Sequence, residues 1–136
     1  MEGEVTHRLV NPPGLAPPVG FSHAVVAAEG RTVYLGGQAG HDPEGRIVDG
    51  GLEAQFDRAC ANVVAALQAC GGAPEHLVQV QIFTLDAAAY RRAAGELGAI
   101  WRRHFGRHYP ALALFEVTGL FDADAIVELV ATAVLP

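Results

Sequence analysis

The chain has an acidic charge balance and lacks a basic stripe, which argues against one class of partner. Its 136 residues carry 9 basic and 15 acidic side chains, giving a net charge of −6. Nucleic-acid-binding proteins normally carry a basic surface that neutralises phosphates. The cations that cluster here lie on and just after one expected helix, where a solvated helix face explains them better than an anion-binding patch. They are Arg91, Arg92, Arg102, Arg103 and Arg107. We therefore do not expect a nucleic acid as partner.

Cysteines are scarce, and the sequence patterns of common metal and cofactor sites are missing. The two cysteines, Cys60 and Cys70, fall on one expected helix. At about 1.5 Å rise per residue their backbones would lie roughly 15 Å apart, too far for a disulfide. His104 and His108 have i, i+4 spacing, but Gly106 interrupts the helix between them. There is no Cys-X-X-Cys pair, Walker loop, GxSxG or HExxH. We expect reduced thiols, no metal and no cofactor.

Long apolar runs are also missing. No window reaches 18 uninterrupted apolar residues, so we expect no membrane span. The first residues, Met1 to Glu4, are acidic and do not resemble a signal peptide, which favours a cytoplasmic protein. The length fits one domain, residues 1–136. Hydrophobic residues make up 51% of the chain, more than a monomer of this size needs, so we expect part of the surplus in a subunit interface.

Apolar residues at three- and four-residue steps predict two helices. The first spans Gly51 to Cys70 and ends at Gly71-Gly72. The second begins after Asp86, a suitable N-cap, and reaches Phe105. Its apolar stripe consists of Tyr90, Ala94, Leu97, Trp101 and Phe105.

Six further segments have the composition of strands, namely residues 7–10, 21–28, 32–36, 78–85, 111–117 and 125–134. The second and third are separated only by Glu29-Gly30-Arg31, which predicts a hairpin. The element order is β-β-β-α-β-α-β-β. It predicts an α+β domain with two helices on one face of a mixed six-stranded sheet. Because the strands are apolar on both sides, a second copy of the sheet is expected to cover the other face.

The stretch Tyr109-Pro110-Ala111-Leu112 resembles the C-terminal signature of the Rid family (YjgF-type reactive-intermediate deaminases), which normally reads Tyr/Phe-Pro-Ala-Arg. Four other segments resemble family patterns in the correct order: residues 20–24, 35–38, 53–55 and 127–129. The resemblance covers roughly Asn11 to Ala133. It implies a chorismate-mutase-like fold and a homotrimer with a small-molecule cleft between subunits.

The resemblance also implies a set of site residues. In members that deaminate, an arginine binds the carboxylate of an imine or enamine, because a guanidinium matches the two oxygens in a plane. Here that position is Leu112, and the small polar position two residues later is Leu114. The glutamate that positions the attacking water survives as Glu128, the candidate catalytic residue.

The remaining positions of the implied site are less polar than in the family pattern. The family tyrosine corresponds to Phe21, which lacks the hydroxyl, and the family serine corresponds to Gly36. Gly37 and Gln38 follow directly. The implied substrate-binding residues are therefore Phe21, Gly36, Gly37, Gln38, Leu112 and Leu114.

Loss of the arginine bears directly on function. A charge-assisted hydrogen bond contributes about 1.5–3 kcal/mol, so its loss weakens carboxylate recognition at least about tenfold. Imines derived from amino acids are thus poor candidates, whereas a neutral or cationic ligand remains compatible with the implied site. One hypothesis is a trimer that hydrolyses a weakly polar metabolite with Glu128 as base. The alternative is a non-catalytic ligand-binding or chaperone-like trimer in which Glu128 is structural. The acidic charge argues against a ribonuclease or translation inhibitor.

Overall fold

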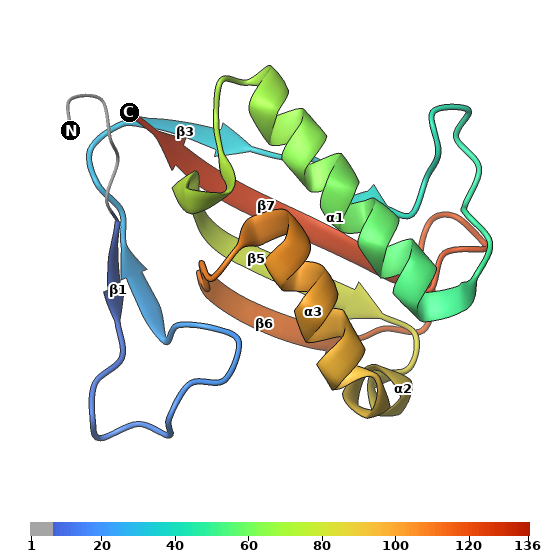
Figure 1. The fold of residues 1–136 in the computed structure, drawn as a ribbon, viewed down its shortest axis with the longest axis horizontal. Helices are drawn as coiled ribbons and strands as arrows, with labels where there is room; N and C mark the ends of the chain where they lie inside the picture. The colour runs from blue at the N-terminus through green and yellow to red at the C-terminus, as the bar shows by residue number, and fades with distance from the viewer. Residues whose placement is uncertain (1–6) are drawn as a thin grey trace.

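The structure is a computed structural model that describes residues 7–136, so the acidic segment Met1 to Glu4 lies outside the described residues. Helices α1 and α3 lie side by side on one face of a mixed β-sheet (Figure 1). The predicted α+β class, with helices on one face of a mixed sheet, is confirmed. In chain order the elements are β1 (Arg8–Val10), β2 (Ala24–Val26), β3 (Arg31–Tyr34), β4 (Gln38–Ala39), α1 (Gly51–Ala69), the 3₁₀ helix η1 (Pro74–His76), β5 (Leu77–Thr84), α2 (Ala87–Arg92), α3 (Ala94–Phe105), β6 (Ala111–Glu116) and β7 (Val127–Leu135).

Strand β7 is the centre of the main sheet. The strand order is β3-β7-β5-β6, and the short strand β4 also pairs with β7. Strands β5 and β6 run parallel, whereas β7 is antiparallel to β3, β4 and β5. The sheet therefore joins segments from both ends of the chain around its last strand.

The two faces of β7 have different environments, as the period-2 alternation of a strand requires. Val127, Leu129 and Ala131 are buried on the side covered by the helices. The intervening Glu128 and Val130 point to the opposite side and are only half-buried. We call this second side the open face of the sheet. In residues 7–136 no helix covers it (Figure 1).

Between the sheet and the two long helices lies the hydrophobic core. Of the apolar stripe expected for the second helix, Leu97, Trp101 and Phe105 are at most 5% exposed, whereas Tyr90 is half-buried and Ala94 is exposed. No helix of the described part of the chain is long and apolar enough to cross a membrane. The buried helical residues are Phe56, Ala59, Cys60, Val63 and Leu67 of α1, and Leu97, Ile100, Trp101 and Phe105 of α3.

The hairpin predicted between residues 21–28 and 32–36 is wrong. Strand β2 pairs instead with β1, as a separate two-stranded ribbon, and β3 pairs with β7. The main sheet thus has five strands rather than six. Gly30 lacks the positive φ that hairpin turns of two residues require. It lies instead against the carbonyl of Leu135, where any Cβ would collide, so this glycine serves the pairing of β3 with β7.

The second predicted helix is divided into two. Asp86 caps α2 as expected, since its Oδ1 accepts a hydrogen bond of 3.0 Å from the Ala89 amide. At Ala93 (φ −94°, ψ 8°) the chain leaves the α-helical conformation, and α3 begins at the next residue. The alanine-rich sequence around this point favours helix on both sides and so gives no sign of the break.

A carboxylate joins the two long helices. Asp57 of α1 accepts hydrogen bonds from His104 Nε2 at 2.6 Å and from Arg103 Nη2 at 2.9 Å, both on α3. The hydrogen bond from His104 is the largest cause that lowers the pKa of Asp57 below its usual 3.8, and the charges of His104 and Arg103 add to it.

We expect Asp57→Asn to lower the melting temperature at neutral pH slightly. The loss should stay below about 1 kcal/mol, because the pair is largely exposed. Since the folded-state pKa is lowered, this stabilisation is present above the unfolded pKa and is lost as pH falls through the folded pKa. The difference between wild type and variant should therefore be smaller in acid, below the usual pKa of 3.8, than at neutral pH.

Thermal unfolding at the two pH values measures this effect. Asp49→Asn, in an exposed loop, is the matched control and should change neither value. A difference between wild type and Asp57→Asn that is as large in acid as at neutral pH would contradict the ionic role of Asp57.

Candidate ligand-binding site

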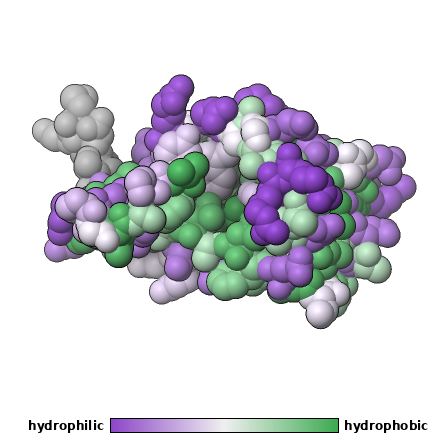
Figure 2. All heavy atoms as spheres, turned by 90° about the horizontal axis from the view of Figure 1, so that it is seen from below, coloured by the Kyte–Doolittle hydropathy of each residue, from purple (hydrophilic) through white to green (hydrophobic). Residues whose placement is uncertain are grey.

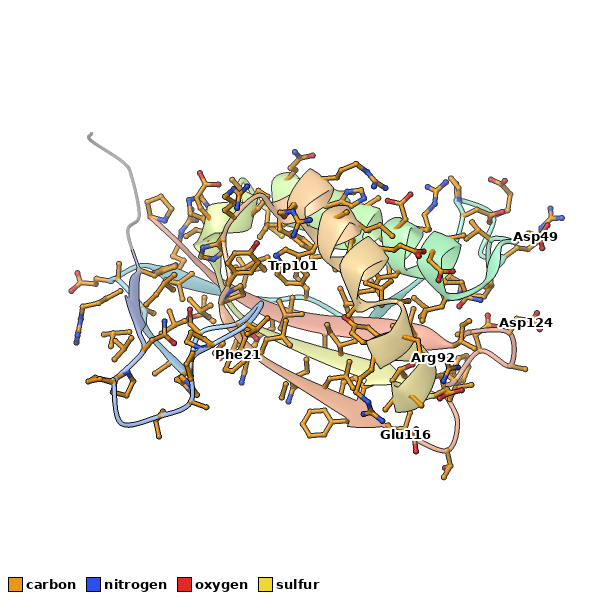
Figure 3. All side chains as sticks on the ribbon, turned by 60° about the horizontal axis from the view of Figure 1, so that its bottom comes forward. Phe21, Asp49, Arg92, Trp101, Glu116 and Asp124 are labelled. Carbon is orange, nitrogen blue, oxygen red and sulfur yellow. The ribbon has the colours of Figure 1, made fainter. Side chains whose placement is uncertain are left out.

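A recess of about 680 Å³ lies between the N-terminal arm (residues 7–26), α3 and β6. This volume is within the range of small-molecule sites. Figure 2 shows apolar surface where the arm, at the left, meets the body of the molecule. The recess walls include Phe21 from the arm, Leu97 and Trp101 from α3, and Leu112 and Leu114 from β6. Figure 3 shows Phe21 and Trp101 at the same end of the molecule.

The arm is fastened to the beginning of β6, and this attachment forms one wall of the recess. The hydroxyl of Ser22 donates a hydrogen bond of 2.6 Å to the carbonyl of Tyr109. The amide of Ser22 donates to the carbonyl of Pro110 at 3.0 Å. Ser22 is buried, and the preceding residue, Phe21, lines the recess together with Leu112.

The loop of the arm is held by a histidine. His23 Nε2 bonds to the carbonyl of Ala16 at 2.7 Å, and its backbone amide donates to Asn11 Oδ1 at 2.7 Å. The ring of Phe21 meets the His23 ring edge-on at 5.1 Å. His23 therefore organises the loop of the arm that carries Phe21.

Leu112 and Leu114 face the helices. In the parallel pairing of β5 with β6, Leu112 is aligned with Val80 and Leu114 with Ile82, both of which are buried in the core. The two leucines are partly buried and pack against that core. The position where the family pattern has arginine thus lies on the helix side of the sheet, at the recess.

Glu128 lies on the other side of the sheet. Its Cα is aligned with those of Phe83 on β5 and Ala39 on β4, and its side chain points to the open face. Glu128 therefore does not share a face with Leu112 and Leu114 within one chain, and the expected cleft that combines them would have to form between subunits. The two-residue alternation within each strand is as the sequence predicts. Which face of β6 lies on the same side as a given face of β7 depends on how both strands pair with β5, and neither strand's own sequence shows this.

Of the three expected site residues at positions 36–38, Gly37 is the one that lies against Glu128. A Cβ on Gly37 would collide with Glu128 Oε2, so the carboxylate rests directly on this glycine. Gln38 is aligned with Leu129, and its side chain makes one long contact of 3.4 Å to the carbonyl of Gly36. None of the residues 7–136 donates a hydrogen bond to the Glu128 carboxylate. The network of backbone amides that a structural Glu128 would need is thus not found in this part of the chain.

The recess has few polar groups. Burial raises the pKa of the Tyr90 phenol, which therefore remains neutral at physiological pH. Trp101 Nε1 donates to the carbonyl of His108 at 3.1 Å. Among residues 7–136, Arg102 is the only charged residue that lines the recess.

Sequence reasoning assigned Tyr90 and Trp101 to a helix stripe and did not detect that they border an open space. Gly98 is the residue that could have indicated this space from the sequence. It lies one turn before Arg102, and it also lines the recess, where the missing side chain leaves room.

The two histidines spaced i, i+4 have separate partners. His104 binds Asp57, and His108 Nε2 bonds to the carbonyl of Leu77 at 2.8 Å. Within residues 7–136 no three His, Cys, Asp or Glu side chains are placed to hold a metal ion.

Comparison with known proteins identifies the family. A family model described as Endoribonuclease L-PSP matches residues 13–135. The RutC family protein UK114 of Drosophila melanogaster is 30% identical over 92% of this chain and 87% of its own length. The human 2-iminobutanoate/2-iminopropanoate deaminase is 29% identical over 79% of this chain and 74% of its own.

A solved structure supports the same assignment. The Rid-family protein YyfB of Yersinia pestis, described as of unknown function, superposes with a TM-score of 0.86 at 30% identity, covering 96% of this chain and 99% of its own. The chorismate-mutase-like fold implied by the sequence resemblance is confirmed. Because the family model spans nearly the whole chain and these relatives match most of it, the chain belongs to the Rid (YjgF, endoribonuclease L-PSP) family.

Proposed function

We propose that this protein binds a small metabolite with a largely apolar body in the recess and does not process small 2-imino acids. The observation that carries the proposal is the convergence of Phe21, Leu112 and Leu114 on one recess that Trp101 also lines. Apolar surface contributes about 25 cal/mol per Å² removed from water. A ligand that fills this space is therefore held mainly by apolar contact.

The human relative is named for 2-iminobutanoate and 2-iminopropanoate, both small carboxylates. The position at which the family pattern provides a guanidinium is Leu112 here. A leucine offers no hydrogen bond to a carboxylate, and desolvating that group against apolar side chains is costly. These substrates therefore fit the recess poorly.

We expect the wild-type protein to hydrolyse 2-iminopropanoate at close to the uncatalysed rate. Leu112→Arg restores the guanidinium and should strengthen binding of this carboxylate at least about tenfold. Leu112→Met, which keeps the volume without the charge, is the matched control. A coupled assay that follows pyruvate formation measures turnover, and competition with pyruvate measures binding. Robust turnover by the wild type would overturn this part of the proposal.

We further propose that the protein is a homotrimer in which copies cover one another's open faces. Two aromatic rings stack on this face, Phe83 and Phe115, with centroids 5.4 Å apart. Phe115 remains 43% exposed and Tyr34, on β3, 81% exposed. Large apolar surfaces of this kind are typical of protein interfaces. The family membership supports the same assembly.

Sedimentation should give a mass of about three times 14.3 kDa. Phe115→Glu places a charge in the proposed interface and should shift the population toward monomer, because an unpaired buried charge is strongly unfavourable. Ala65→Glu, at an exposed position on α1, is the control and should leave the mass unchanged. A wild-type monomer at micromolar concentration would contradict the trimer.

Hydrolysis by Glu128 is the second candidate function. Its support is a carboxylate that receives no hydrogen bond from any described residue and rests on Gly37. Because Glu128 and the recess occupy opposite faces of the sheet, this carboxylate can serve a ligand in the recess only from another copy. Trimerisation is thus a condition for catalysis, whereas binding in the recess alone is not.

We expect Glu128→Gln to keep the trimer and to change stability by less than about 0.5 kcal/mol, since no described hydrogen bond is broken. If Glu128 acts on the ligand, the same variant abolishes turnover or ligand binding. Gly37→Ala, whose Cβ would collide with the carboxylate, should reproduce that loss by displacing Glu128. Thermal unfolding and ligand affinity are measured side by side. Lost stability with unchanged binding would show that Glu128 is structural.

A further inference from the structure

We infer that the ligand of the recess is an amphipathic carboxylate, whose apolar body lies against Phe21 and Leu112 and whose carboxylate is bound by Arg102. The inference rests on the proposed role of the recess as the ligand site. It specifies the chemistry of the ligand's polar end and assigns that end to a side chain on a helix.

Arg102 follows Trp101 on α3 and is the only charged residue of the described part of the chain that lines the recess. Its guanidinium reaches back over Gly98, one helical turn earlier. Nη1 lies 3.5 Å from the position that a Cβ on Gly98 would occupy. The glycine therefore leaves open the space beside the guanidinium at the edge of the recess. An apolar recess with a single cation at its edge is complementary to an anion with an apolar body.

Arg102 differs from the neighbouring Arg103 in its partners among the described residues. Arg103 forms an ion pair of 2.9 Å with Asp57 and so has a structural partner. No carboxylate of residues 7–136 forms a salt bridge with Arg102. A guanidinium in this position can offer two parallel N–H donors, which match the two oxygens of a carboxylate.

The location of Arg102 also sets the size of the ligand. The cation stands on α3, whereas the family pattern has it at position 112 of β6. A ligand that contacts both Arg102 and Leu112 must span the recess between helix and strand. A volume of about 680 Å³ admits a molecule considerably larger than a three- or four-carbon imino acid.

The inference adds to two readings of the sequence. Arg102 is exposed, as expected for a solvated helix face, and it also lines the recess, while the ligand becomes an anion with an apolar body. The helix positions of Arg102 and Arg103 differ by only one residue, but they face different surroundings. Arg103 faces α1, and Arg102 faces the recess.

The test compares 3-phenylpropanoate with its neutral analogue 3-phenylpropanamide on the full-length protein. Trp101 is the only tryptophan of the chain and lines the recess, so its fluorescence reports occupancy directly. Titration calorimetry gives the affinities independently. We expect the carboxylate to bind at least about tenfold more tightly than the amide, a difference of about 1.4 kcal/mol. High salt should reduce this difference.

Arg102→Gln should remove the preference for the carboxylate and leave the affinity for the amide unchanged. Arg102→Lys keeps the positive charge but lacks the planar guanidinium with its paired N–H donors, so it should retain part of the preference for the carboxylate over the amide. Arg92→Gln is the matched control, because Arg92 lies on α2, away from Phe21 and Trp101 (Figure 3).

The outcomes separate the inference from the proposal on which it rests. Equal affinity for acid and amide, or a preference that survives Arg102→Gln, would overturn the role of Arg102 while the recess remains a ligand site. If neither probe binds or changes the Trp101 fluorescence, the recess itself fails as a ligand site, and the inference fails with it.

Discussion

The pairing of β5 with β7 decides which side chains of this protein can meet. It aligns Ile82 with Leu129 on the helix side and Phe83 with Glu128 on the open face. A slip of one residue would turn Glu128 into the core and expose leucine and valine, which is strongly unfavourable. The register therefore fixes Glu128 on the face opposite the recess in every copy of the chain. Any chemistry that combines the two needs more than one copy.

The fold tolerates a leucine where the family pattern has arginine because of the location of the position. Leu112 lies on β6, aligned with the buried Val80, and its side chain packs partly against the core. An aliphatic residue suits that environment as well as the stem of an arginine does. The change thus leaves the architecture intact and alters the recess. Fold and activity are separable here, since the activity depends on a few side chains carried by a common scaffold.

Local patterns in the sequence were sufficient for much of the fold. The stripe from Phe56 to Leu67 and the cap at Asp86 depend on neighbours within a few turns, so they could be predicted. Gly30 shows where such reasoning fails. Its role follows from contact with Leu135 at the far end of the chain, which no local turn pattern shows. For the candidate site the resemblance supplied the residues, but their division between two faces and the presence of Arg102 at the recess required the pairing of distant strands.

A crystal structure of the protein grown with 3-phenylpropanoate is the most direct test of the central claim, that the recess is a ligand site. The account predicts density for the ligand between Phe21, Trp101 and Leu112. It also predicts copies arranged so that their open faces are covered. A recess filled by side chains of a neighbouring copy, with the ligand bound elsewhere or absent, would contradict it.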